Sequence, residues 1–124
     1  MKTILVCGSR DWTDKDIILE ALPFAIEKIK IIHGGAKGAD SLAGEIAQEL
    51  GFEVVVFYPD WKKYGKAAGF KRNIQMLQEN PDEVIAFWDG QSRGTKHTID
   101  SDKKRNIPVT IWYEYDDILD REIL

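Results

Sequence analysis

Short apolar runs alternate with amphipathic stretches along almost the whole chain, and this alternation leaves few folds open to it. Five apolar runs predict β-strands, at residues 3–7, 31–32, 53–58, 83–88 and 109–113. Four stretches with apolar residues at helical spacing separate them. Strands that alternate with helices are typical of a parallel sheet covered by helices on both faces. The sequence therefore predicts an α/β fold with a five-stranded parallel sheet.

The expected helices have recognisable limits. Thr13 and Asp16 resemble a capping box that starts a helix of about four turns, which continues to Ile29 and is kinked or broken at Pro23. The other helices are expected at residues 42–50, 61–78 and 95–105, and the acidic residues 114–124 are compatible with a short helix. The helix at 95–105 departs from ordinary amphipathic spacing, because Asp102 occupies a position where apolar packing would be expected.

The composition favours one domain without a membrane span. The chain has 124 residues, 44% of them apolar, so it can form one core but is too short for two ordinary domains, and we expect a single domain over residues 1–124. No window approaches the roughly 20 apolar residues that a membrane-spanning helix needs. The only cysteine, Cys7, can form no internal disulfide, and the apolar run before Gly8 is too short for a signal peptide. A cytoplasmic protein is expected.

The charge of the chain limits its partners. Lys and Arg number 17 against 21 Asp and Glu, a formal net charge of -4, which disfavours a broadly cationic nucleic-acid or membrane-surface protein. Any anion site must therefore be local. Residues 61–78 contain no acidic residue and five cationic ones, namely Lys62, Lys63, Lys66, Lys71 and Arg72. A solvated helix face is the favoured interpretation of the lysines.

Arg72 needs a separate argument. In one continuous helix it lies opposite the face formed by Ala67, Phe70, Ile74 and Leu77, so periodicity predicts an exposed side chain. It would reach a site at the sheet edge only from the first turn of its helix or from a neighbouring subunit.

Glycine-rich and polar loops follow four of the expected strands. Right-handed crossovers bring the carboxyl ends of parallel strands to one edge, where such sheets bind ligands. That edge collects Gly8-Ser9-Arg10, His33-Gly34-Gly35, residues 58–61 and residues 89–95. If the second and fourth strands flank the first, their loops face each other across a crevice of nucleotide size.

Two of these loops have the composition of anion sites. Glycines between a strand and a helix let backbone amides and a helix N-terminus approach a phosphate. Residues 34–40 fit this description but match neither the Walker A motif nor the dinucleotide fingerprint. An ordinary tight turn with Asp40 or Ser41 as the helix cap is an equal alternative. Residues 92–95 could offer amides, two hydroxyls and the Arg93 guanidinium, or merely form a capped helix start.

Residues for catalysis are scarce. The acid–base candidates near the edge are Asp40, Asp60, Asp89, Glu45 and the two histidines, but none forms a recognisable dyad. His33 and His97 lack a companion at ligand spacing, so no metal and no cofactor are expected. No serine lies in a nucleophile elbow, and Cys7 lies inside an expected buried strand. Trp12, Trp61 and Trp88 could each stack on a base or simply cover the core.

Four motifs together resemble a known family. Gly8-Ser9-Arg10, residues 33–40, residues 69–73 and residues 92–95 are similar to those of the YspA-like, cpYpsA-related branch of the SLOG superfamily, over about residues 2–113. That superfamily also contains the DNA-processing protein A and Lonely Guy proteins, which are Rossmann-like domains for nucleotide-derived ligands. The resemblance implies a small-molecule site formed by Gly8, Ser9, Arg10, Gly34, Gly35, Lys37, Gly38, Asp40, Arg72, Asn73, Asp89, Ser92, Gly94 and Thr95.

The resemblance leaves three functions open. The first is a sensor or sequestering protein for an ADP-ribose-like or cyclic nucleotide signal. The second is a nucleotide N-glycosidase or phosphoribohydrolase, but Thr98 stands where Lonely Guy enzymes carry their glutamate, so Asp89, Asp40 or Glu45 would have to replace it. Single-stranded DNA binding is the third and is least favoured by the charge. SLOG relatives often assemble as homo-oligomers, which this chain is expected to do as well.

Overall fold

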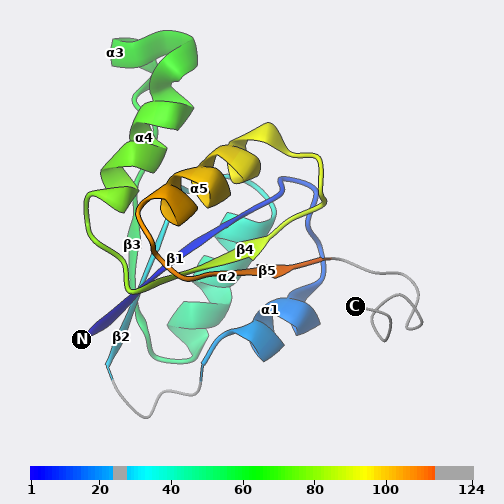
Figure 1. Cartoon of the computed structure of the whole chain (residues 1–124). Helices are drawn as coiled ribbons and strands as arrows, with labels where there is room; N and C mark the ends of the chain where they lie inside the picture. Colours follow the sequence, from blue (N-terminus) through cyan, green and yellow to red (C-terminus); the bar gives the residue numbers. More distant parts are fainter. Residues whose placement is uncertain (24–27, 114–124) are drawn as a thin grey trace.

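The computed structural model describes residues 1–23 and 28–113 and has a Rossmann-like α/β fold (Figure 1). All strands are parallel and lie in one five-stranded sheet of order β3-β2-β1-β4-β5. The strands are β1 (Lys2–Gly8), β2 (Ile29–His33), β3 (Glu53–Val56), β4 (Glu83–Phe87) and β5 (Val109–Trp112). The predicted fold class is confirmed, and β2 and β4 flank β1, which meets the condition under which their loops were expected to face each other.

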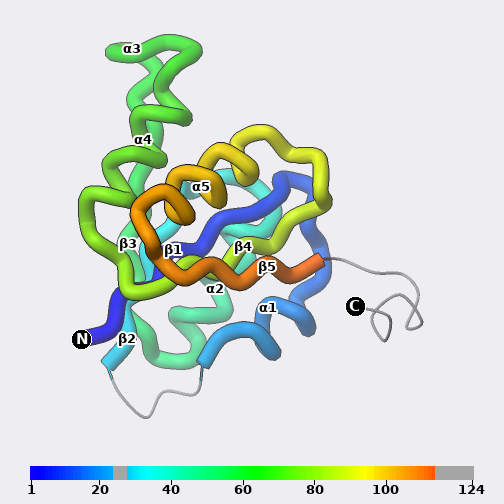
Figure 2. Tube along the Cα trace, viewed as in Figure 1, coloured from blue at the N-terminus to red at the C-terminus, as the bar shows by residue number. Residues whose placement is uncertain are grey.

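Helices cover both faces of the sheet (Figures 1 and 2). They are α1 (Lys15–Ala21), α2 (Ala39–Glu49), α3 (Trp61–Tyr64), α4 (Ala68–Leu77) and α5 (Arg93–Lys104). Side chains alternate along β1, so Ile4 and Val6 join a core beneath α1 and α2, whereas Leu5 and Cys7 join a second core beneath α4 and α5. The two cores share a rigid central strand, whose carboxyl end leads directly into Ser9 and Arg10.

The first expected helix is shorter in the structure than predicted. Helix α1 ends at Ala21 rather than near Ile29, because Pro23 has no amide hydrogen to continue it. Ile29 begins β2, which is longer than the two-residue strand expected. The N-cap is Asp14, whose carboxylate accepts from the Ile17 amide at 3.1 Å. The segments expected to be helical at residues 24–27 and 114–124 lie outside the described residues.

The third expected helix is divided. Residues 61–78 form α3, a 3₁₀ turn at Gly65–Ala67 and then α4. Helix α3 ends at Gly65, whose φ of +54° is not helical. Glycine adopts this backbone conformation more readily than other residues. The break turns α3 away from the sheet, so α3 and the start of α4 project beyond its carboxyl edge (Figure 1).

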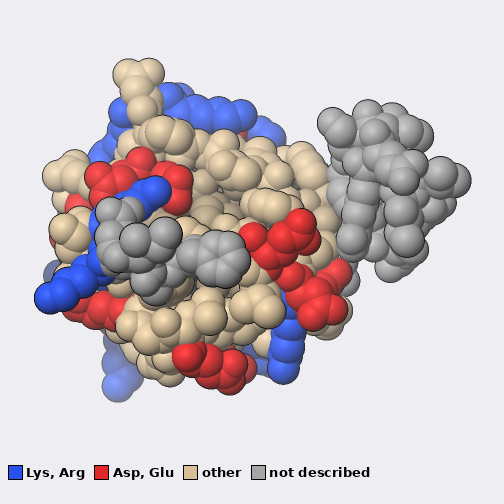
Figure 3. All heavy atoms as spheres, turned by 90° about the horizontal axis from the view of Figure 1, so that it is seen from below, with Lys and Arg blue, Asp and Glu red and all other residues tan. Residues whose placement is uncertain are grey.

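The surface does not carry one large basic region on the face drawn in Figure 3, where acidic and basic side chains are interspersed. Within residues 1–23 and 28–113, no helix has the length and apolar character needed to cross a membrane.

Candidate functional site

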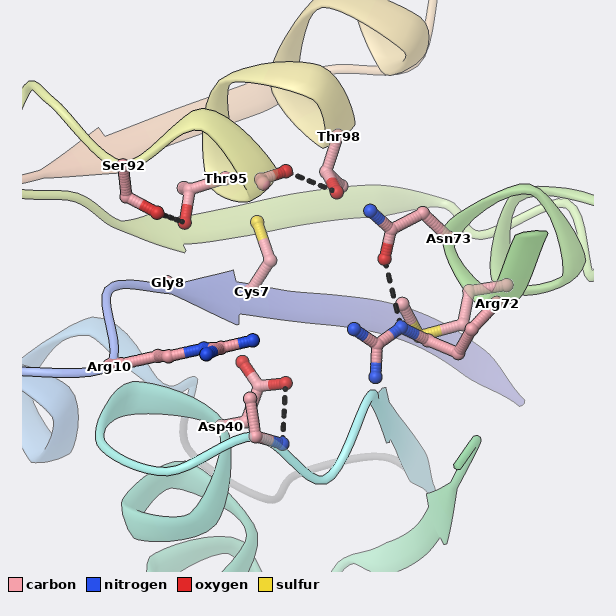
Figure 4. A pocket seen from close by; sticks show the side chains of 12 residues that line it. Cys7, Gly8, Arg10, Asp40, Arg72, Asn73, Ser92, Thr95 and Thr98 are labelled. Carbon is pink, nitrogen blue, oxygen red and sulfur yellow. Dashed lines mark hydrogen bonds between the residues drawn. The ribbon is translucent and has the colours of Figure 1, made fainter. Parts of the chain in front are cut away.

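The loops after β1, β2 and β4 surround a cavity of about 210 Å³ at the carboxyl edge of the sheet, which we call the anion pocket (Figure 4). The chain places β2 and β4 on opposite sides of β1, and sheets of this type bind ligands at such a switch in strand order. The pocket is lined by Cys7, Gly8, Arg10, Ala36, Asp40, Arg72, Asn73, Met76, Ser92, Gly94, Thr95 and Thr98. The two loops expected to face each other across a crevice therefore do so.

A second cavity of about 440 Å³ adjoins the anion pocket, and we call it the aromatic compartment. Arg10, Ala36 and Arg72 line both cavities. The other walls of the aromatic compartment are Gly34, Gly35, Lys37, Tyr58, Pro59 and Trp61. Together the cavities fall within the roughly 300–1,000 Å³ that ligand pockets usually occupy.

Three of the expected site residues, Ser9, Gly38 and Asp89, line neither cavity but hold in place the loops that do. The buried Ser9 hydroxyl accepts from the Asp89 amide at 2.9 Å, and the Ser9 carbonyl accepts from the Ala39 amide at 3.2 Å. The Asp89 carboxylate accepts from the amides of Gln91 and Ser92, both at 2.8 Å, which lowers the Asp89 pKa. A Cβ on Gly38, whose φ is +76°, would collide with the carbonyls of Ser9 and Arg10. These contacts hold the loops after β1, β2 and β4 together.

The glycine loop after β2 is fixed by Asp40. One Asp40 oxygen, Oδ2, accepts from the Gly34 amide at 3.1 Å and the Ala36 amide at 3.4 Å. The Gly35 amide donates to His33 Nδ1 at 3.0 Å. These three amides are therefore occupied within the protein. Their arrangement agrees with a tight turn, but the expected helix cap was wrong, because Gly38 and neither Asp40 nor Ser41 is the N-cap of α2. An anion in the pocket would be held by other groups.

Arg72 lies half-buried at the junction of the two cavities. Its Nη1 donates to the Gly34 carbonyl and, at 3.5 Å, to the Phe57 carbonyl, while its Nε donates to Asn73 Oδ1 at 2.9 Å. A Cβ on Gly34 would collide with the guanidinium group, so any larger residue at this position would displace Arg72 from its present place. Arg72 thus connects α4 to the loops after β2 and β3.

The prediction that Arg72 is exposed was wrong. It rested on a buried face that included Phe70 and Ile74, but these side chains are 50% and 36% exposed. The buried residues of α4 are Ala68, Asn73, Met76 and Leu77. Phe70, Arg72 and Ile74 all lie in α4, whose start projects beyond the sheet, so the apolar face is left partly uncovered and the face that contains Asn73 and Met76, next to Arg72, is the one that packs.

The anion pocket contains two guanidinium groups and one buried carboxylate. In Figure 4 the Asp40 carboxylate lies between the guanidinium groups of Arg10 and Arg72. Burial raises the Asp40 pKa to about 6, against the opposing effects of the two backbone amides and both arginines. Burial likewise lowers the Arg72 pKa and is the main cause of the lowered His33 pKa. At neutral pH Asp40 is ionised. The positive charges of Arg10 and Arg72 then exceed its single negative charge, so the net charge of these three groups beside the pocket is positive.

The first turn of α5 forms the opposite wall. Ser92 is its N-cap but makes no side-chain capping bond, and the Ser92 hydroxyl instead lies 3.2 Å from Thr95 Oγ1. Ser92, Gly94 and Thr95 line the pocket, so the positive end of the α5 dipole lies beside it. Thr98, one turn further on, lines the pocket and donates to the Gly94 carbonyl at 3.3 Å. Arg93 lines neither cavity.

The remaining candidates lie elsewhere. Glu45 is exposed on α2, and Asp60 caps α3 by accepting from the Lys63 amide at 3.1 Å. The His97 ring packs against Phe70 with centroids 4.6 Å apart. Across residues 1–23 and 28–113, no group of three His, Cys, Asp or Glu side chains is placed to hold a metal ion. Sequence reasoning missed Cys7, Ala36, Met76 and Thr98 as residues of the anion pocket. The first three are apolar and carry no chemical signal, and Thr98 was noted only as the residue in the place of a glutamate.

Comparison with known proteins places the chain in a family. The model of the YspA, cpYpsA-related SLOG family matches residues 2–64. The Gene 61 protein of Mycobacterium phage D29 is 36% identical over 118 residues, which cover 88% of this chain and 94% of that protein. The X-ray structure of TM1055 has the same fold with a TM-score of 0.67 and 23% identity, over 88% of this chain and 72% of that chain. This chain belongs to the YspA, cpYpsA-related SLOG family, as its motifs predict.

Proposed function

We propose that the protein binds a phosphate-bearing, nucleotide-derived ligand, of the ADP-ribose or cyclic nucleotide type, and acts as a sensor or sequestering protein for it. The observation that carries this proposal is the convergence of Arg10, Arg72 and the first turn of α5 on one cavity. Arg10 makes no hydrogen bond or salt bridge to any residue that the structure describes, and its guanidinium points into the pocket (Figure 4). Such a cation is ready to pair with a phosphate.

The ligand class follows from the family and from the size of the site. The SLOG family is associated with nucleotide-derived ligands. The anion pocket alone is small, but it shares Arg10, Ala36 and Arg72 with the aromatic compartment, so a molecule held at these residues would border both cavities. A free phosphate would leave the larger cavity empty. A molecule with a phosphate at one end and further bulk beyond it fits the two cavities better.

Replacing Arg10 by alanine tests the anion pocket. We expect the affinity for AMP or ADP-ribose to fall about 10- to 100-fold, because a charge-assisted pair with phosphate is lost while no hydrogen bond that holds the fold is broken. Isothermal titration calorimetry measures the change. Arg93→Ala is the matched control, since it removes the same charge at the same edge from a residue outside both cavities. Equal losses in the two variants, or none in Arg10→Ala, would remove Arg10 from the site.

The position of Asp40 in the anion pocket supports a second candidate function, an N-glycosidase. Of the three carboxylates that could replace the absent glutamate, only Asp40 lines the anion pocket, and its pKa of about 6 suits proton transfer near neutral pH. If this activity exists, Asp40→Asn should abolish release of the free base while the ligand remains bound. Asparagine keeps an oxygen for the amides of Gly34 and Ala36, so the loop is preserved. Base release by the wild type that continues unchanged in Asp40→Asn would exclude Asp40 as the catalyst.

A further inference from the structure

The aromatic compartment contains two large rings that the fold does not need for its core. Tyr58 is 72% exposed and Trp61 is 55% exposed, although both side chains line a cavity. Neither ring stacks on another aromatic ring in the part of the chain that the structure describes. Exposed apolar rings gathered in one place usually mark a binding site.

The other two tryptophans expected near the sheet edge have structural partners. Trp12 is buried, packs on Phe87 with centroids 5.4 Å apart, and donates from Nε1 to the Asp14 carbonyl at 2.9 Å. Trp88 donates from Nε1 to the Ser92 carbonyl at 3.1 Å. Trp61 is therefore the tryptophan of this edge whose ring remains open to a ligand.

Local contacts fix the backbone that carries both rings. A Cβ on Gly35 would lie 2.8 Å from Tyr58 Cε1 and 2.9 Å from Cδ1, so the tyrosine ring packs directly against the glycine loop. Pro59 restricts the backbone between the rings. The Asp60 carboxylate accepts from the Lys63 amide at 3.1 Å and so fixes the first turn of α3, where Trp61 lies. A fixed backbone reduces the conformational entropy that these residues lose when a flat molecule stacks on their rings.

We propose that the aromatic compartment is a nucleobase subsite, in which Tyr58 and Trp61 stack against the base of a nucleotide whose phosphate occupies the anion pocket. The inference rests on the proposed function, because Arg10 and Arg72 at the junction anchor the phosphate end. The ribose then spans the junction, and the base enters the cavity walled by Tyr58, Pro59 and Trp61. Stacking uses the flat face that every base has, so this subsite accepts purines and pyrimidines.

The test compares AMP with ribose 5-phosphate, which share a phosphate and a pentose and differ by the base. In the wild type, we expect AMP to bind ~10- to 100-fold more tightly, as stacking on aromatic side chains usually provides. Tyr58→Ala and Trp61→Ala should each reduce AMP affinity by roughly 10-fold and leave ribose 5-phosphate affinity unchanged. Tyr58→Phe and Trp61→Phe, which keep a ring, should restore most of the AMP affinity.

Phe70→Ala is the control, because Phe70 is 50% exposed and lines neither cavity. It should leave both affinities unchanged. Equal affinity of the wild type for the two probes, or equal losses of both probes in Tyr58→Ala, would overturn the base subsite and leave the phosphate site intact. Failure of both probes to bind the wild type would overturn the proposed function as well. Thermal unfolding of each variant shows whether the fold is retained, as expected for exposed side chains.

Discussion

Arg72→Met is expected to abolish measurable AMP binding and to lower the stability of the protein. The change removes one of two guanidinium groups beside the anion pocket and three hydrogen bonds, to the Gly34 carbonyl, the Phe57 carbonyl and Asn73. We expect the affinity to fall by more than about 100-fold, because the cation and the position of the glycine loop are lost together. The free energy of unfolding should fall by about 2–3 kcal/mol, since part-buried polar groups lose their partners.

Calorimetry with AMP and chemical denaturation measure the two effects. Lys71→Met is the matched control, because it removes the same charge from the neighbouring position, where the exposed Lys71 lies over the Tyr64 ring. We expect this variant to bind AMP like the wild type. If Arg72→Met binds AMP within threefold of the wild type, Arg72 does not contact the ligand.

Asp102→Asn is expected to remove part of the pH dependence of the free energy of unfolding. Asp102 is fully buried on α5, and neither of its carboxylate oxygens has a hydrogen-bond partner in the described part of the chain. Burial raises its pKa from 3.8 to about 7, with only partial compensation by Arg105. The folded protein therefore binds this proton more tightly than the unfolded chain, so the free energy of unfolding falls as pH rises from about 4 to about 7.

The variant has no such proton, so its stability relative to the wild type should improve by about 2 kcal/mol between pH 5 and pH 8. Urea denaturation at several pH values measures the difference, and contributions from Asp40 and the other titrating groups cancel because both proteins share them. Asp100→Asn, at an exposed position of the same helix that pairs with Lys96, should show no comparable change. A constant difference between wild type and Asp102→Asn across this range would mean that Asp102 titrates normally.

The fold was predictable because its signals are local and repeated. Each strand contains a short apolar run, and the direction of parallel crossovers then fixes which loops meet at one edge. The helix boundaries were less accurate where one backbone angle decides the structure. Gly65 separates α3 from α4, and the break at this glycine could not be distinguished from a tolerated glycine inside a helix.

The sequence predicted which loops lie near the candidate site, but not which contacts their residues make. The motifs brought Arg10, Asp40, Ser92 and Thr95 to one cavity. The sequence could not show that Asp40 occupies the amides of Gly34 and Ala36, because that contact depends on the three-dimensional path of the loop. Helical periodicity misplaced Arg72 because it assumes that a helix is covered evenly along its length.

The aromatic compartment was the part of the site with the weakest signal. Tyr58 and Trp61 follow a strand, but an aromatic residue at a strand end is at least as readily explained by packing on the core. Only the structure shows that Trp12 and Trp88 have partners while Trp61 and Tyr58 remain exposed beside the cavity.

The central claim, that this chain binds a nucleotide-derived ligand without cleaving it, is tested most directly by a retention experiment. The purified protein is incubated with a mixture of nucleotides, NAD, ADP-ribose and cyclic nucleotides, ultrafiltered, and both fractions are analysed by liquid chromatography with mass detection. We predict that one class of phosphate-bearing compounds is retained intact by the wild type and lost by Arg72→Met. A free base and a ribose phosphate in the filtrate would contradict this account and establish a glycosidase, and retention of nothing would contradict nucleotide binding itself.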